Sequence, residues 1–354
     1  MSSVPVTGAS QPTASTTSLS PNQRAWARFK RNRLGYVSLV VFVILLAVAT
    51  VAEIVSNDRP FLARYDSNWY LPIISNPPEI RFGGDFKTPA EWHDPLIRAN
   101  LAKGRNFAVF TLNEYGPDTL NYASAVPDPA PPGGGHWLGT DAEGRDVTAR
   151  LLYGFRISVY FGFALTFAGT LLGIVVGALQ GYFGGRVDLT TQRVIEIWNA
   201  IPELYLLIIL ASIFAPSLLL LLVVFTLFGW IALSDYVRAE FLRNRNLEFV
   251  RAARALGLSN RQIIVRHLLP NSMTPVITFL PFRMSAAILF LTSLDFLGLG
   301  VPDLPSLGGL LREGKENLDA WWISVPTFVV LVATLLLLTF VGDALRDAFD
   351  TRKS

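Results

Sequence analysis

Long runs without a charged residue are the feature that most constrains this chain. Leu204–Ser234 has no charged side chain over 31 residues, and Ile157–Gly185 has none over 29. A helix needs about 20 apolar residues to cross the hydrocarbon core of a bilayer. Only 16% of the 354 residues are charged, whereas a soluble domain usually has about 25%. The chain is therefore predicted to lie largely in a membrane.

The residue types and motifs disfavour an enzyme. The chain contains no cysteine, which excludes disulfides, thiol nucleophiles and Cys-ligated metals. Its three histidines are far apart, and it has no HExxH or GxSxG motif. Gly309–Lys315 has the spacing of a phosphate-binding loop, but Glu316 stands where a Ser or Thr should bind magnesium, and no strand is expected before it. We predict neither a catalytic nor a metal site.

The distribution of basic residues predicts six spans. Residues 34–56 form the first span, which we interpret as a retained helix because it lacks the small-residue cleavage site of a signal peptide. The 204–234 run is too long for one helix, and Pro216 interrupts it. A hairpin at Pro216 places the seven arginines of 238–266 on the same side as the basic N-terminus, as the positive-inside rule requires. Helix two is expected in the window 157–185. Helix three is expected to begin near Leu189 and helix four near Ser217, and helices five and six are expected at 274–297 and 322–341.

These spans predict an all-α transmembrane bundle with both termini in the cytoplasm. A periplasmic α+β insertion, a cap with short strands, is expected between helices one and two. Loops longer than about 12–15 residues are usually functional or disordered, and this one is rich in aromatic residues. The predicted order is a disordered basic tail (1–33), helix one (34–56), the cap (57–150), a helical core (151–345) with a cytoplasmic loop (238–271), and a cytoplasmic tail (346–354).

Small residues and two acids stand out within the predicted spans. Gly173 and Gly177 lie four residues apart, a spacing that lets helices approach closely in lipid. Glu203 and Asp295 lie in or near spans, where a buried acid is costly enough to suggest a function. An acid at a helix end is more often solvated, so an intramembrane protease is disfavoured.

The segment EFVRAARALGLSNRQIIVRHLLPN, residues 248–271, predicts two short helices joined by a hinge. Asn246 is expected to cap the first helix, at 247–256. Gly257 suits the left-handed position that ends a helix. Alanines make this first helix narrow enough for a groove on another protein, with arginines able to pair with acids at its rim. A solvated basic loop that only fixes topology is the alternative.

The second short helix has its own start and stop signals. Ser259 and Gln262 have the spacing of a capping box. We expect this helix to end where Pro270 begins the return into the membrane.

This loop resembles the EAA motif of bacterial ABC-importer permeases, in which Glu-Ala-Ala is followed by Gly and later by Leu-Pro. The matching residues are Ala252, Ala253, Gly257, Leu269 and Pro270. Arg251 replaces the Glu and His267 replaces an Ile, as is common in the dipeptide and oligopeptide branch. Two more segments are similar to that branch: HWLGTDAEGRDVTARLLYGFRIS at 136–158 and DFLGLGVPDLPSLGGLL at 295–311.

Further segments resemble the Yej-type permeases of importers for peptides and microcin C-like peptide antibiotics. They are RYDSNWYLPI, FGGDFKT, GYFGGRVDL and VGDALRDAFD. The resemblance covers nearly the whole chain beyond residue 24. It implies a type I importer in the bacterial inner membrane, with a second, different permease, two cytoplasmic ATPase subunits and a periplasmic peptide-binding protein. ATP and magnesium would bind to those partners, and this chain would be no enzyme and bind no cofactor, metal or nucleic acid.

The resemblance also implies roles for particular residues. The EAA helix would dock in the ATPase and transmit its closure to the membrane helices, which switch between two rigid packings. The implied coupling residues are Arg251, Ala252, Ala253, Arg254, Gly257, Leu269 and Pro270. Asp295, Gly298 and Gly300 are candidates for the pathway or its gate. Asp295 stands where a small polar residue is expected.

Two other transport functions are open alternatives. A related importer for another solute, such as nickel or glutathione, would share the same loop. A secondary transporter would need intramembrane charges or discontinuous helices at a midplane cavity, and helices two, four and six offer almost no charges.

Overall fold

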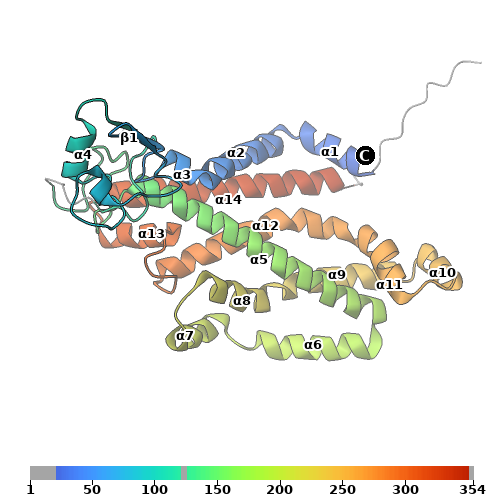
Figure 1. The fold of residues 1–354 in the computed structure, drawn as a ribbon. Coiled ribbons are helices and arrows are strands. Elements are labelled where there is room, and N and C mark those ends of the chain that lie inside the picture. The colour runs from blue at the N-terminus through green and yellow to red at the C-terminus, as the bar shows by residue number, and fades with distance from the viewer. Residues whose placement is uncertain (1–20, 121–125, 351–354) are drawn as a thin grey trace, which may run out of the picture.

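A computed structural model describes residues 21–120 and 126–350, and Figure 1 shows a long helical bundle with a small sheet at one end. The helices, in chain order, are α1 (Pro21–Arg31), α2 (Arg33–Thr50), α3 (Ala52–Val55), α4 (Pro95–Leu101), α5 (Val147–Phe183), α6 (Gly185–Asn199), α7 (Glu203–Ile213), α8 (Leu218–Gly229), α9 (Ile231–Asn244), α10 (Glu248–Ala255), α11 (Asn260–Gln262), α12 (Leu269–Phe296), α13 (Leu307–Glu316) and α14 (Trp321–Phe349). A 3-10 turn, Glu79–Phe82, and a π-helical segment, Ile263–Leu268, complete the helical elements.

Among residues 21–120 and 126–350, five helical segments are long and apolar enough to cross a membrane, and the bent pair α6–α7 gives a sixth if it counts as one span. The five are Arg33–Thr50, Val147–Phe183, Leu218–Asn244, Asn260–Phe296 and Trp321–Phe349. The 204–234 run is divided as expected, because α7 ends at Ile213 and α8 begins after Ser217, whose side chain caps it. The bend of 65° between α6 and α7 had no counterpart in the sequence prediction.

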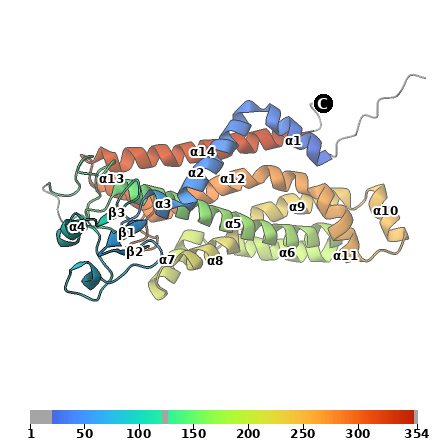
Figure 2. The same ribbon diagram turned by 45° about the horizontal axis from the view of Figure 1, so that its top comes forward.

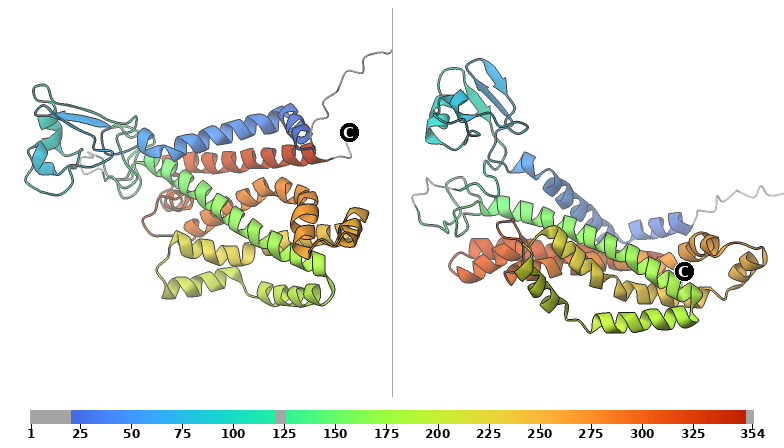
Figure 3. Two further views of the ribbon diagram at one scale, coloured as in Figure 1. Left: turned by 45° about the vertical axis from the view of Figure 1, so that its right-hand side comes forward. Right: turned by 60° about the horizontal axis from the view of Figure 1, so that its bottom comes forward.

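The residues between α3 and α5, which we call the insertion, stand beyond one end of the bundle (Figures 1 and 3). They contain an antiparallel sheet of β1 (Leu62–Tyr65), β2 (Asn68–Tyr70) and β3 (Phe107–Val109), in the order β2-β1-β3. Phe82 and Trp92 are buried beneath it together with helix α4. The insertion thus has its own hydrophobic core, as a small folded unit needs.

Glycines allow α5 and α9 to pack closely. Gly169, Gly173, Gly177 and Gly181 repeat every four residues along α5, so they share one face. A Cβ atom at Gly173 would lie 3.0 Å from the Leu233 Cβ, and one at Gly177 would lie 2.9 Å from the Val237 Cβ. Both distances are too short for ordinary packing. The close packing expected at Gly173 and Gly177 is therefore confirmed.

Residues 21–31 were expected to be disordered, and this is wrong. They form α1, which packs on α14 at the end of the bundle opposite the insertion (Figure 2). Phe29 is buried there against Val341 and Ala344. A basic amphipathic helix can bury one apolar side chain while its charges stay in water, and counting charges alone missed this. The tail prediction for residues 1–20 lies outside the described residues.

The helices extend beyond the uncharged runs used to place them. Helix α5 begins at Val147 rather than near 157, α6 begins at Gly185 rather than near 189, and α14 continues to Phe349. Charged residues are accommodated in the added turns by pairing. Arg156 of α5, for example, lies 2.8 Å from a carboxylate oxygen of Glu53. An uncharged run marks the part of a helix in lipid, and not the whole helix.

Candidate functional site

The EAA loop, residues 245–271, lies at the end of the bundle opposite the insertion (Figure 1). Helix α10 ends in a Schellman motif, since the Leu258 amide donates to the Ala253 carbonyl and the Gly257 amide donates to the Arg254 carbonyl. Gly257 has a φ of +75°, the left-handed conformation expected from the sequence. The capping box of Ser259 and Gln262 is also present and opens α11. These two predictions are confirmed.

Two other local predictions for this loop are wrong. Asn246 does not cap α10, because the N-cap position is Leu247 and no side chain caps this end. The second helix does not stop at Pro270 but runs from α11 through the π-helical segment into α12 as one continuous span, Asn260–Phe296. Proline is tolerated in the first turn of a helix, and the wide π turn before it changes the hydrogen-bonding register.

The loop presents an apolar surface to its surroundings. Phe249 and Ala252 of α10 and Leu256, its C-cap residue, follow one another at helical spacing and are all exposed, with Leu256 80% accessible. Arg251 and Arg254 lie beside them and are exposed as well. An exposed apolar patch rimmed by charges is typical of a protein interaction site. Phe249 and Leu256 were not among the predicted coupling residues, although their spacing from Ala252 could have indicated them.

The other predicted coupling residues lie outside this exposed apolar surface. Ala253 is buried and belongs to the core, together with Val250 and Ile263, so it holds α10 in place. Gly257 and Pro270 are exposed, and Leu269 is half-buried against the same core.

A few polar contacts join the EAA loop to the membrane helices. The Tyr182 hydroxyl at the end of α5 donates to the Asn260 side chain at 2.6 Å. The Arg254 guanidinium lies 5.4 Å from the centre of the Tyr182 ring. A displacement of α10 would therefore be passed to α5 and α12 through a packed core, which moves as a unit rather than deforming smoothly.

The two outer motifs pack against each other at the insertion end. Asp146 caps α5, accepts a hydrogen bond from the Asn113 side chain at 2.8 Å and lies 2.8 Å from the His136 ring. Gly154 of the first motif contacts the backbone of Ser306 in the second. These motifs therefore join the insertion to the bundle.

The candidate gate residues lie in the second of these motifs. Gly298 has a φ of +80° in the turn after α12. A Cβ atom at Gly300 would overlap the carboxylate of Asp295, which is buried, and one at Gly308 would lie 2.6 Å from the Asp295 Cβ. The lack of space for a side chain explains the glycines at both positions. A role in gating stays a prediction.

A buried charge cluster lies at the same junction. Arg145 lies 2.8 Å from Asp141, which is fully buried, and 3.5 Å from Glu313 of α13. Burial raises the pKa of Glu313 to about 7, and the nearby negative charge of Asp141 contributes to the rise. Within the described residues, one Glu313 carboxylate oxygen has no hydrogen-bond partner. The junction is therefore more favourable with Glu313 protonated.

Glu313→Gln is expected to stabilise the protein at pH 8. The folded-state pKa of Glu313 lies above its ordinary value, so stability falls as the pH rises from about 4.5 to about 7. Each pKa unit is worth about 1.4 kcal/mol, so the loss is up to about 3 kcal/mol. Melting temperatures of the detergent-solubilised protein would show a gap between variant and wild type that widens from pH 5 to pH 8. The control is Glu316→Gln, at an exposed carboxylate on the same helix, which should keep the pH slope of the wild type. Equal pH slopes for Glu313→Gln and wild type would contradict the expectation.

Comparison with known proteins decides the family. Residues 169–354 match the family described as binding-protein-dependent transport system inner membrane component, and residues 20–78 match the N-terminal transmembrane domain of oligopeptide transport permease C. The chain belongs to this family of importer permeases. The match confirms the predicted permease fold and the multi-pass location in the inner membrane.

Named relatives of this permease cover most of its length. The inner membrane ABC transporter permease protein YejE of Escherichia coli K12 is 48% identical over 95% of this chain and 99% of its own. The peptidoglycan transport system permease protein YejE of Agrobacterium fabrum C58 is 45% identical over 94% and 93%. The oligopeptide transport permease OppC of Haemophilus influenzae is 36% identical over 62% of this chain and 71% of its own. Permease subunits of this kind are not themselves enzymes.

Proposed function

We propose that this permease forms one half of the translocation path of an ATP-driven peptide importer. The relatives named for oligopeptide and dipeptide transport support peptides as the substrate class. The observation that carries the mechanism is the exposed EAA loop, whose apolar stripe is rimmed by arginines and backed by the bundle core. ATP and magnesium bind to two partner ATPase subunits that dock on this stripe, and a second permease completes the path.

In the proposed cycle, this chain transmits the movement of the ATPases through helices that move as rigid bodies. Closure of the ATPases on ATP displaces α10, and the shared core of α5, α9 and α12 carries the movement toward the insertion end. The helices then exchange an inward-open for an outward-open packing. The insertion receives the periplasmic binding protein and contributes to the outer gate, because it is the folded part of the chain beyond the membrane at that end.

This function places the EAA loop and both termini in the cytoplasm and the insertion in the periplasm. The absence of native cysteine makes the arrangement testable with single substitutions. A membrane-impermeant maleimide applied to spheroplasts is expected to label Ile74→Cys, at a residue 79% exposed in the insertion. It should label Asn246→Cys, at an exposed residue between α9 and α10 and outside the stripe, only after permeabilisation. Labelling of Asn246→Cys in intact spheroplasts would overturn both the orientation and the proposed function.

Uptake tests the substrate class. Cells with the gene deleted are expected to lose uptake of a labelled tetrapeptide and to regain it with the wild-type chain. Copies of this chain purified from the membrane should carry a second permease and ATPase subunits. A related importer for nickel or glutathione remains the alternative, and it is favoured if the deletion abolishes uptake of that solute and leaves tetrapeptide uptake unchanged.

A further inference from the structure

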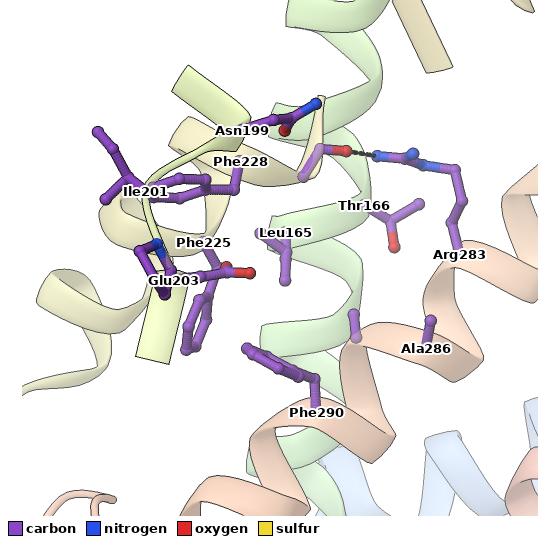
Figure 4. Close-up of a pocket in the computed structure, with 13 residues that line it drawn as sticks. Leu165, Thr166, Asn199, Ile201, Glu203, Phe225, Phe228, Arg283, Ala286 and Phe290 are labelled. Carbon is purple, nitrogen blue, oxygen red and sulfur yellow. Dashed lines mark hydrogen bonds between the residues drawn. The ribbon is translucent and has the colours of Figure 1, made fainter. Parts of the chain in front are cut away.

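A cavity of about 560 Å³ lies among α5, α8, α12 and the break between α6 and α7 (Figure 4). Its volume falls within the range of small-molecule sites, about 300–1,000 Å³. Ile201 and Pro202, in the non-helical link between α6 and α7, line one side. Non-helical backbone at membrane depth is tolerated only where protein buries it or a water-filled cavity solvates it. The break in the helix therefore has a physical reason to lie beside this cavity.

Two opposite charges face this cavity from different helices. Glu203, the first residue of α7, and Arg283, in the middle of α12, both line it and approach from opposite sides in Figure 4. Within the described ranges, neither side chain has an ion-pair partner. An acid is favoured in the first turn of a helix, where it faces the positive end of the macrodipole. An unpaired charge within a membrane span is costly and marks a functional site by default.

Arg283 has a hydrogen-bond donor without a partner among the described residues. One terminal nitrogen of Arg283 donates to the Gly229 carbonyl at 2.8 Å, which fixes the guanidinium at the cavity wall (Figure 4). Its Nε is buried and, in the part of the chain that the structure describes, has no partner. The Thr166 hydroxyl, buried beside it, likewise has no partner among those residues. These groups could bind an oxygen-rich anion such as a carboxylate, for which arginine has a matching geometry.

Apart from Thr166, Asn199 and the two charges, the side chains that line the cavity are apolar. Leu165, Phe225 and Phe290 lie between the two charges (Figure 4). These three side chains can pack against peptide side chains of many shapes without donating or accepting hydrogen bonds. Selectivity would then reside in the two charged ends, which every unmodified peptide has in common.

We propose that this cavity is a transit site for short peptides, in which Arg283 binds the C-terminal carboxylate and Glu203 binds the N-terminal ammonium group. The proposal rests on the proposed function and deepens it, because it names the groups on the substrate that this chain recognises. A discontinuous helix beside intramembrane charges is the arrangement by which membrane transporters commonly build substrate sites. The site is sequence-independent, which suits a permease that receives many peptides from one binding protein.

The experiment uses the complete transporter in proteoliposomes, with saturating binding protein loaded with labelled tetra-alanine, its C-terminal amide or its N-acetyl form. Arg283→Gln is expected to lower tetra-alanine uptake at least tenfold and to change amide uptake less than twofold. Glu203→Gln should likewise lower tetra-alanine uptake at least tenfold and change uptake of the N-acetyl form less than twofold. The matched controls are Arg193→Gln and Glu196→Gln, at an exposed ion pair on α6 outside the cavity. Both should keep the wild-type uptake of all three peptides.

A second measurement does not depend on transport. Ala286→Cys places the only thiol of this chain in the cavity lining. Tetra-alanine is expected to slow maleimide labelling of this thiol in the assembled complex at least threefold, and adding Arg283→Gln should remove the protection.

The outcomes separate this inference from the proposed function. If the wild-type complex takes up none of the peptides, the proposed function fails. If the wild type transports tetra-alanine but the cavity variants match the controls, or if the peptide gives no protection, only the transit site is overturned. Loss of the second permease from Arg283→Gln complexes would show that Arg283 pairs with that subunit, which also overturns the site.

Discussion

Gly257→Val is expected to lower peptide uptake sharply while this permease still assembles with its proposed partners. Gly257 ends α10 at a φ of +75°, and a β-branched residue is a genuine outlier there. The strain, about 1–3 kcal/mol, would be relieved by a change in the angle between α10 and α11. Since about 1.4 kcal/mol is a tenfold change in an equilibrium, we expect uptake to fall by about 5- to 100-fold. Uptake and ATP hydrolysis by the reconstituted complex would be measured together.

The control for this prediction is Gly257→Asn. Asparagine occupies the left-handed region more readily than other non-glycine residues. Within the described residues, a Cβ atom at position 257 would meet nothing within 4 Å, so neither substitution clashes inside this chain. Asn at this position should therefore keep most of the uptake. Unchanged uptake with Val would refute the role of this turn in coupling.

Gly177→Val is expected to prevent stable folding of the permease. A Cβ atom at this position would lie 2.9 Å from the Val237 Cβ and 3.1 Å from the Arg238 backbone nitrogen, and would overlap the Ser234 carbonyl. Backbone atoms cannot move aside without separating α5 from α9. Overpacking costs roughly 1–3 kcal/mol and occasionally more, and a backbone clash belongs at the upper end. The measure is the amount of monodisperse protein extracted in detergent and its melting temperature.

Val175→Leu is the control for the glycine face. Val175 lies two residues earlier on α5 and is 48% exposed, so a larger side chain points away from α9. This variant should be extracted in wild-type amounts. Equal yields of Gly177→Val and Val175→Leu would show that α5 and α9 do not need the close approach seen here.

The EAA loop shows which turns and helix ends can be predicted from the local sequence. The Gly257 turn and the capping box at Ser259 were predictable because each depends on the residues within one helical turn. The N-cap was predicted one residue too early, because α10 begins after Leu247 without a capping side chain. The stop at Pro270 was wrong. Leu268 before this proline and Val276 after it both pack in the core shared with α5 and α9, and such contacts between distant segments are not visible in the local sequence.

The grouping of the cavity residues could not be predicted from the sequence. Glu203 was noted in the sequence as an acid near a span, but nothing in its neighbourhood connects it with Arg283, 80 positions away. Arg283 is the one basic residue in its predicted helix, 274–297, and belongs to no motif. The two residues line one cavity because the break between α6 and α7 lies beside α5, α8 and α12.

Sequence alone determined that this chain crosses the membrane several times, that Pro216 divides its longest apolar run and that its basic loop carries the EAA signature. Hydrophobicity, charge and turn geometry act over a few residues, so the order of residues is enough to reveal them. The tertiary structure decided which face of α10 is exposed, that Ala253 supports the loop from within, and that two isolated charges share a cavity. Those features depend on which helices pack together, and that is fixed by contacts between segments far apart in the chain.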